Sequence, residues 1–204
     1  MRRLIARSLE MLVLPLVALL SVGGSIAEAV DLNAHLLMGD YHFSRTRTCI
    51  RASDFNANNG VVSNGSTATD AAQGTVHYNG DGTGTLTARL LFINHNMTAN
   101  GDRPVTQADV TCELTYTVHA DDTFTELLTT CTALVIAGPG TGLTVTGTGI
   151  EHKGLFANGR TSFVFGSVNP NNIEETKNAA QAIVSKAICS RSGTAVKSNN
   201  PPAR

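Results

Sequence analysis

The sequence predicts an all-β protein folded as an eight-stranded antiparallel up-and-down barrel. Threonine, which favours strands over helices, makes up about one residue in eight. Short segments rich in Thr, Val, Tyr and Phe alternate with clusters of turn residues. Four cysteines are spaced so that the first and last of these segments can be joined covalently. A two-sheet β-sandwich is the alternative, because short strands and frequent turns also permit it.

The length and charge of the chain limit what it can be. Its 204 residues suffice for one domain with a sizeable core, and a charged fraction of 15% is too low for a disordered chain. The formal net charge of -1 argues against a nucleic-acid partner.

The first 29 residues have the features of a secretory signal. A basic start is followed by the apolar run 11–20, and Ala27-Glu28-Ala29 fits the small-residue cleavage rule. An uncleaved anchor helix is less favoured, since this run is about half as long as a membrane span and Pro15 interrupts it. We therefore expect a secreted or periplasmic protein with one domain over residues 30–197, no membrane span after cleavage and a disordered tail over 198–204.

Eight candidate strands follow, each rich in β-branched and aromatic residues between turn signals. They span residues 39–50, 74–79, 83–93, 109–119, 123–135, 142–149, 160–168 and 182–190. The intervening segments 51–72 and 94–109 are rich in Asn, Gly and Asp, so both are expected to be polar loops, the first of them a candidate lid. Residues 173–181 are expected to form a short helix before the last strand, because Asn171 or Asn172 can cap it and two glutamates fall in its first turn. Whether the whole segment 173–189 is helix or strand is left open by the sequence.

Turn lengths fix which side chains share a face of the sheet. A three-residue loop over residues 80–82 pairs Val76 with Leu86 and gathers the apolar residues of both strands on one face. A four-residue loop over residues 120–123 sets Cys112 opposite Cys131, Leu114 opposite Thr129 and Tyr116 opposite Leu127.

The cysteines predict two disulfides, as an even count in an exported chain usually does. Cys112 and Cys131 face each other in the second hairpin, which leaves Cys49 to pair with Cys189. That second bridge joins the first candidate strand to the last, and in a sequential meander neighbouring ends mean a closed ring.

Three segments of the chain resemble known proteins. They resemble the repeated segments of uncharacterised exported bacterial proteins, and they are GTVHYNGDGTGTLT (74–87), CELTYTVHADDTFTELLTTC (112–131) and GIEHKGLFANGRTS (149–162). Those proteins are in turn similar to lipocalin and allene-oxide-cyclase-like barrels. The resemblance implies a calycin-like barrel over most of the mature chain and supplies no catalytic residue.

Two arginines stand out as candidate ligand-binding residues. Arg45 and Arg47 alternate in phase with Tyr41, Phe43 and Cys49, so all five share one strand face. We favour a solvent-facing position, in which the arginines need no partner, because surface strands often carry arginine. If the face instead lines a barrel lumen, both guanidinium groups need an anion such as the carboxylate of a ligand. On that alternative the candidates are Arg45, Arg47, Phe92 and Tyr116, beside the inward-facing Leu86, Ala88, Leu90 and Leu114.

No set of catalytic or metal-binding residues occurs at a recognisable spacing. There is no C-x-x-C, no pair of histidines at ligand spacing, no nucleophile elbow and no phosphate loop. His42, His77 and His119 fall in strands on expected solvent faces, and Glu113 and Glu126 have no carboxylate partner. We therefore expect no metal and no cofactor.

The sequence predicts a binding protein for a small apolar or amphipathic ligand rather than an enzyme. Two alternatives remain: a cyclase or isomerase that uses the barrel cavity, and a filled barrel that acts as an interaction protein at the cell envelope. An apolar cavity favours binding, titratable groups at its mouth favour the enzyme, and a packed interior favours the third function.

Overall fold

The computed structural model describes residues 33–63, 65–96, 100–167, 169 and 171–199, which form an all-β fold. The elements are η1 (Ala34–Leu36), β1 (Met38–Ala52), β2 (Ser66–Asn79), β3 (Thr83–Asn94), β4 (Val105–Val118), β5 (Thr123–Ala137), β6 (Thr144–Thr148), β7 (Ile150–Ala157), η2 (Asn158–Arg160), β8 (Ser162–Gly166), β9 (Ile173–Lys177) and β10 (Ile183–Lys197). The expected signal segment and residues 200–204 of the expected tail lie outside the described residues. The part of the chain that the structure describes has no helix long and apolar enough to cross a membrane.

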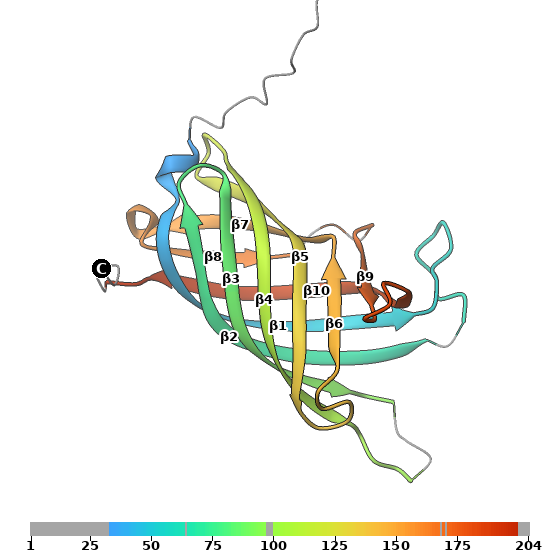
Figure 1. Ribbon diagram of the computed structural model, residues 1–204. Coiled ribbons are helices and arrows are strands. Elements are labelled where there is room, and N and C mark those ends of the chain that lie inside the picture. Colours follow the sequence, from blue (N-terminus) through green and yellow to red (C-terminus); the bar gives the residue numbers. More distant parts are fainter. Residues whose placement is uncertain (1–32, 64, 97–99, 168, 170, 200–204) are drawn as a thin grey trace, which may run out of the picture. The chain divides into compact units, whose positions relative to one another are not determined.

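The strands close into an antiparallel ring that is eight strands around and has the form of a barrel (Figure 1). β1 to β5 follow one another as neighbours, and β10 returns to pair with β1. The sixth position is shared by β6 and β7, which are separated at Gly149 (φ +77°), and the seventh by β8 and β9. Both pairs fill the space between β5 and β10, so the ring has no free edge along its circumference.

Side chains alternate between the lumen and the outer face along the strands, as the pleat requires. On β1 the residues from Tyr41 to Cys49 that share the phase of Tyr41 point inward, and Tyr41 and Cys49 are buried. The outward positions of β3 and β4 are mostly threonine and charged residues. They include Thr83, Thr85, Thr87, Arg89, Asp109, Thr111, Glu113, Thr115 and Thr117, all exposed.

The first hairpin has the predicted loop, and the second departs from the predicted pairing by one residue. Val76 pairs with Leu86 across β2 and β3, and Gly82 takes the left-handed φ of +92° that the three-residue loop needs. In the β4–β5 hairpin Cys112 pairs with Cys131, but Leu114 pairs with Leu128 rather than with Thr129. A β-bulge at this point inserts one extra residue into β5, so the sequence-based pairing is wrong from there to the turn.

The structure contains the two disulfides that the sequence predicts, Cys49–Cys189 and Cys112–Cys131. Each joins directly paired residues on neighbouring strands, with Cα atoms 4.1 Å apart. The first ties β1 to β10, the place where the ring closes.

Residues 173–181 form no helix, so that prediction is wrong. β9 occupies the first part, where Glu174 is buried and the strand pairs with both β6 and β10. A strand is favoured here because it fills a position that would otherwise leave two open edges. The two expected loops are also shorter than predicted, since β2 begins at Ser66 and β4 at Val105.

One end of the lumen is packed and covered. Leu37, which follows η1, is fully buried, and Tyr116 donates a hydrogen bond to its carbonyl oxygen at 2.8 Å. The backbone N–H of Gly80 in turn donates to the Tyr116 hydroxyl at 2.9 Å. Aromatic rings fill the space beneath, at centroid separations of 4.9–6.3 Å, and they include Tyr41, Tyr78, Phe124, Phe156 and Phe163.

Candidate ligand-binding site

Beyond the packed end, the lumen widens into a cavity of about 330 Å³. One wall is apolar and comes from β3, β4 and β5, with Leu90, Phe92, Val110 and Val135 among its residues. The facing wall includes β1, which carries Arg45, Arg47 and Arg51, and β9, which carries Glu174 and Glu175. This volume is at the lower end of the range that small-molecule sites occupy.

The β1 face that carries these arginines is turned to the lumen, so the favoured solvent-facing position is wrong. The reason is local: Tyr41 and Phe43 on the same face are 0% and 7% exposed, and they fix the direction of the face by packing in the core. Because side chains alternate strictly along a strand, the arginines must follow them inward.

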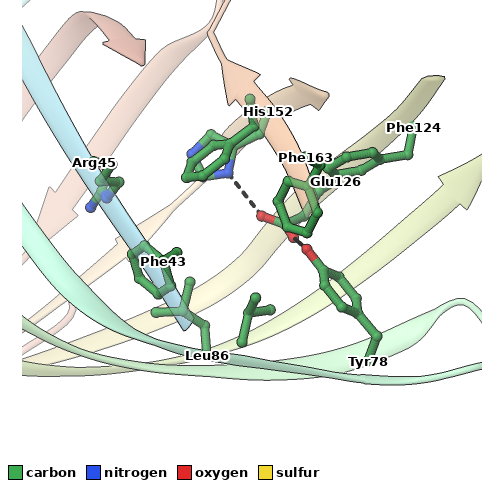
Figure 2. Close-up of a pocket in the computed structure, with 10 residues that line it drawn as sticks. Phe43, Arg45, Tyr78, Leu86, Phe124, Glu126, His152 and Phe163 are labelled. Atoms are coloured by element: carbon green, nitrogen blue, oxygen red, sulfur yellow. Dashed lines mark hydrogen bonds and ion pairs between the residues drawn. The ribbon is translucent and has the colours of Figure 1, made fainter. Parts of the chain in front are cut away.

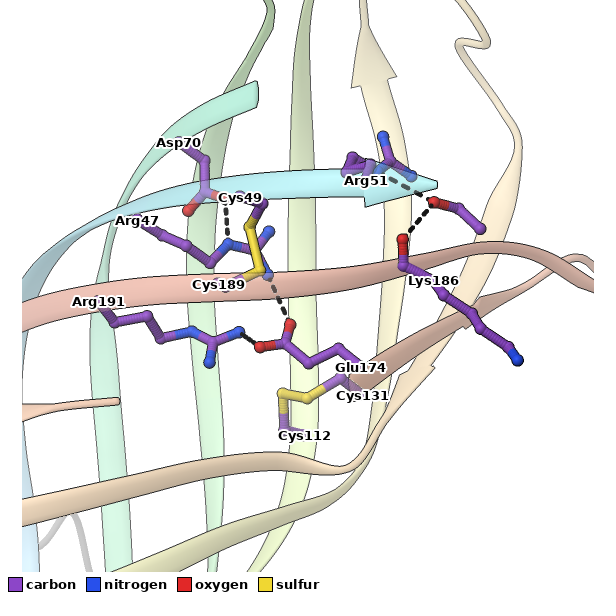
Figure 3. A network of polar contacts seen from close by, with 11 residues as sticks. Arg47, Cys49, Arg51, Asp70, Cys112, Cys131, Glu174, Lys186, Cys189 and Arg191 are labelled. Carbon is purple, nitrogen blue, oxygen red and sulfur yellow. Dashed lines mark hydrogen bonds and ion pairs between the residues drawn. A yellow bond between two sulfur atoms is a disulfide. The ribbon is translucent and has the colours of Figure 1, made fainter. Parts of the chain in front are cut away.

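Most of the lumen charges are engaged in one ion-pair network (Figure 3). Arg47 pairs with Asp70 on β2, and its Nη1 donates to Glu174 Oε2 on β9 at 3.1 Å. The other Glu174 oxygen accepts from Arg191 on β10. Glu174 thus joins two arginines from different strands, and Arg47 has no free charge to offer a ligand.

Arg51 lies farther along β1. Its Nε donates to the Ser185 hydroxyl at 3.2 Å, and its guanidinium carbon stands 5.2 Å from the centroid of the Phe92 ring. Burial lowers the pKa of Arg51. The arginine and the ring together give the apolar wall a cationic border.

Arg45 forms no ion pair within the described residues, which distinguishes it from Arg47; Arg51 also lacks an ion pair there but donates a hydrogen bond to Ser185. Its Nη1 is buried and has no hydrogen-bond acceptor among those residues. Burial, and next the charge of Arg47, lower the pKa of Arg45 to about 9, so the group is still a cation at neutral pH. The backbone leaves room for this side chain because its partner on β10 is Gly193, where any Cβ would come within 2.8 Å of the Arg45 Cβ.

A small chamber lies at the inner end of the cavity (Figure 2). Arg45 and Leu86 line both spaces, so Arg45 stands at the boundary between them. Within the chamber, Glu126 accepts a hydrogen bond from the Tyr78 hydroxyl at 2.5 Å, and its other oxygen lies 2.8 Å from His152 Nδ1. Glu126 and His152 are directly paired across β5 and β7.

The chamber network fixes the protonation of the imidazole ring of His152. Burial lowers the pKa of His152, and the hydrogen bond to Glu126 offsets this only in part. The ring is therefore neutral at pH 7 and carries one proton. The carboxylate oxygen of Glu126 accepts the hydrogen bond from the ring, so this proton sits on Nδ1 and Nε2 presents a lone pair. That Nε2 atom is buried without a partner among the described residues.

The depressed pKa of His152 predicts a loss of stability on acidification. The unfolded chain binds a proton near pH 6.5 and the folded chain does not, so the contribution of neutral His152 is complete above that pH and falls as the pH drops toward the folded-state pKa. Urea unfolding at pH 7.5 and 5.5 measures this difference. The difference should shrink in His152→Phe and persist in His42→Gln, which changes an exposed histidine; an unchanged difference in His152→Phe would contradict the assignment.

The structure brings some of the sequence-predicted residues together and separates others. Arg45, Arg47 and Phe92 line the cavity, whereas Tyr116 lies in the packed end and belongs to the covering of the lumen. Leu86, Ala88 and Leu90 line the cavity, and Leu114 is buried in the packed core.

Sequence reasoning missed Glu126 and His152. In the predicted hairpin pairing Glu126 faces outward and Leu127 inward, but the bulge in β5 reverses them, leaving Glu126 4% and Leu127 41% exposed. β7, which carries His152, was not among the predicted strands. The alternation of Ile150, His152, Gly154 and Phe156 is the signal that could have identified it.

Within the described residues, no group of three or more His, Cys, Asp or Glu side chains is placed to hold a metal ion. No protein-family model matches the chain, and no curated protein matches it significantly. Among solved structures, Neisserial surface protein A is similar over 78% of this chain and 97% of its own, at 9% identity and a TM-score of 0.48. The structure of EF1p2_mFAP2b bound to DFHBI is similar over 83% of this chain and all of its own, at 15% identity and a TM-score of 0.29.

Proposed function

We propose that the protein is an exported binding protein whose barrel holds one small amphipathic anion. The observation that carries this proposal is Arg45: a charged guanidinium group, with one nitrogen buried and without a partner among the described residues, at the inner end of a cavity with one apolar wall. The acidic group of the ligand would bind Arg45, and its apolar part would lie against the wall formed by β3, β4 and β5.

The energetics of buried charge support an anionic ligand. A buried cation without a partner costs several kcal/mol, and a carboxylate that hydrogen-bonds to it offsets much of that cost. Arg191 also has buried nitrogens without partners, but it pairs with Glu174 and does not line the cavity. Arg45 is therefore the side chain on which an added anion would act most strongly.

The outer face of the barrel supports a water-exposed protein. A barrel that spans an outer membrane needs an apolar band around its whole circumference. The outward positions of β3 and β4 are instead mostly threonine and charged residues. Two disulfides fit an oxidising, extracytoplasmic compartment.

A binding role is favoured over an acid–base enzyme by the position of His152. The Glu126–His152 pair has the form of a general base with its orienting carboxylate. However, His152 does not line the main cavity, and the chamber it does line has a volume of only about 10 Å³. The chamber is the size of one water-sized sphere and has no room for the reacting carbon atoms of a substrate.

Binding of dodecanoate, a simple amphipathic anion, tests the proposal by isothermal titration calorimetry. Wild-type protein should bind it saturably, and Arg45→Ala should bind at least about 2 kcal/mol more weakly, roughly thirtyfold, because the carboxylate loses a cavity guanidinium group that has neither an ion pair nor a hydrogen bond among the described residues. Arg89→Ala is the matched control, since Arg89 is exposed on the outer face and pairs with Asp109. Equal affinities for wild type and Arg45→Ala, or no binding to wild type, would exclude the proposed function.

A further inference from the structure

We infer that the inner chamber is a second, polar subsite that takes a hydroxyl group, so the preferred ligand is a hydroxylated amphipathic acid rather than a plain one. This inference rests on the proposed function, because it assumes that an acidic group binds at Arg45. It specifies what the atoms next to that acidic group should be.

The first step is an account of the unsatisfied polar atoms in the chamber. His152 is 2% exposed, and its Nε2 is buried without a partner among the described residues. Arg45 Nη1 is buried and unpartnered in the same way, and both side chains line the chamber. Buried polar groups in folded proteins are nearly always hydrogen-bonded, so two in one small space call for an occupant.

The second step is to assign which of the two atoms donates a hydrogen bond and which accepts one. Arg45 Nη1 can only donate, whereas His152 Nε2 accepts because the ring proton is held on Nδ1 by Glu126. Tyr78 donates a hydrogen bond to the other oxygen of Glu126. Burial raises the pKa of Tyr78 well above the usual value, so its hydroxyl stays protonated and donates. The occupant must accept from Arg45 and donate to His152. A hydroxyl group does both, and a carboxylate cannot donate.

The third step is size and access. The chamber volume of about 10 Å³ admits one hydroxyl or one water molecule but no longer group. The other polar side chains of its lining, Tyr78 and Glu126, are already hydrogen-bonded within the network, and the rest of the lining is apolar. In the view of Figure 2, His152 is drawn between Arg45 and Glu126, with Phe43 and Leu86 below them. Since Arg45 also borders the main cavity, a ligand whose hydroxyl is next to its carboxylate can reach both subsites at once.

The experiment compares three acids by isothermal titration calorimetry: dodecanoate, 2-hydroxydodecanoate and ω-hydroxydodecanoate, which carries its hydroxyl at the far end. Wild type should bind 2-hydroxydodecanoate about tenfold more tightly than the other two, because only this acid pairs the His152 acceptor. His152→Phe, which keeps a ring of similar size, should lose the preference for 2-hydroxydodecanoate over dodecanoate. Arg45→Ala should weaken all three.

A second measurement on unmodified protein covers the case in which His152→Phe fails to fold. The ¹⁵N resonance of His152 Nε2 should move when 2-hydroxydodecanoate is added and stay in place with dodecanoate. Equal affinity of wild type for dodecanoate and its 2-hydroxy derivative, or a preference that survives in His152→Phe, would overturn the subsite while leaving the Arg45 proposal intact. Failure of all three acids to bind would overturn both.

Discussion

Replacing Glu174 by glutamine is expected to lower the free energy of unfolding by about 3–5 kcal/mol, the usual loss when one member of a buried ion pair is removed. Glu174 is 6% exposed and bonds to both Arg47 and Arg191. Glutamine has a single acceptor oxygen and no charge, so at least one of these guanidinium groups would be left buried without its counter-ion. Urea unfolding at pH 7.5 measures the loss.

Glu175→Gln is the matched control, because the neighbouring glutamate is only half-buried and meets Lys177 at a loose 3.9 Å. Glu175→Gln should change the free energy of unfolding by less than about 1 kcal/mol. Glu174→Gln should also strengthen dodecanoate binding, since it removes a negative charge near the proposed anion site. A stability loss in Glu174→Gln no larger than in Glu175→Gln would show that the ion-pair network does not hold β9 in the ring.

Local reasoning about turns and cysteines predicted much of this fold. The Val76–Leu86 pairing followed from matching apolar residues across a short loop, and the Cys49–Cys189 bridge followed once Cys112 had been paired with Cys131. These inferences worked because a turn fixes the register of a hairpin over many residues. The closed ring then followed from a single covalent constraint.

The residues of the proposed site depend largely on features that hairpin turns and cysteine spacing do not indicate. A bulge of one residue turns Glu126 into the lumen, and its partner His152 belongs to a strand that pairs with β5 only because β6 and β7 share one position in the ring. The burial of Glu174 depends on two arginines, one of them more than 100 residues away. Glutamates near a capping residue suggest a helix, and only these distant contacts favour a strand.

For the β1 face that carries the arginines, two sequence arguments oppose each other. Tyr41 and Phe43 in phase with Arg45 already indicate a buried face, whereas the general frequency of surface arginine argues for an exposed one. The structure follows the aromatic residues: burial of Tyr41 and Phe43 in the core favours the inward face, and Arg47 on that face is compensated by Asp70 and Glu174. A functional site is where such local conflicts are expected.

The Cys49–Cys189 disulfide should contribute more to stability than any other covalent link in the fold. It closes a loop with a sequence separation of 140, against 19 for Cys112–Cys131. In the chain-entropy model these loops correspond to about 5 and about 3 kcal/mol. The double variant Cys49→Ala/Cys189→Ala should therefore lose about 5 kcal/mol in urea unfolding, a large part of the stability of an ordinary domain.

The double variant Cys112→Ala/Cys131→Ala is the matched control for this disulfide. Both bridges join directly paired residues with the same Cα separation, and all four cysteines are buried, so the two variants lose similar contacts and differ chiefly in loop length. The β4–β5 hairpin keeps its strands close without a bridge, whereas β1 and β10 meet only through the closed ring. Equal losses in the two double variants would mean that the longer loop of Cys49–Cys189 gives no extra stabilisation. Residual structure in the unfolded chain would then already bring β1 and β10 together.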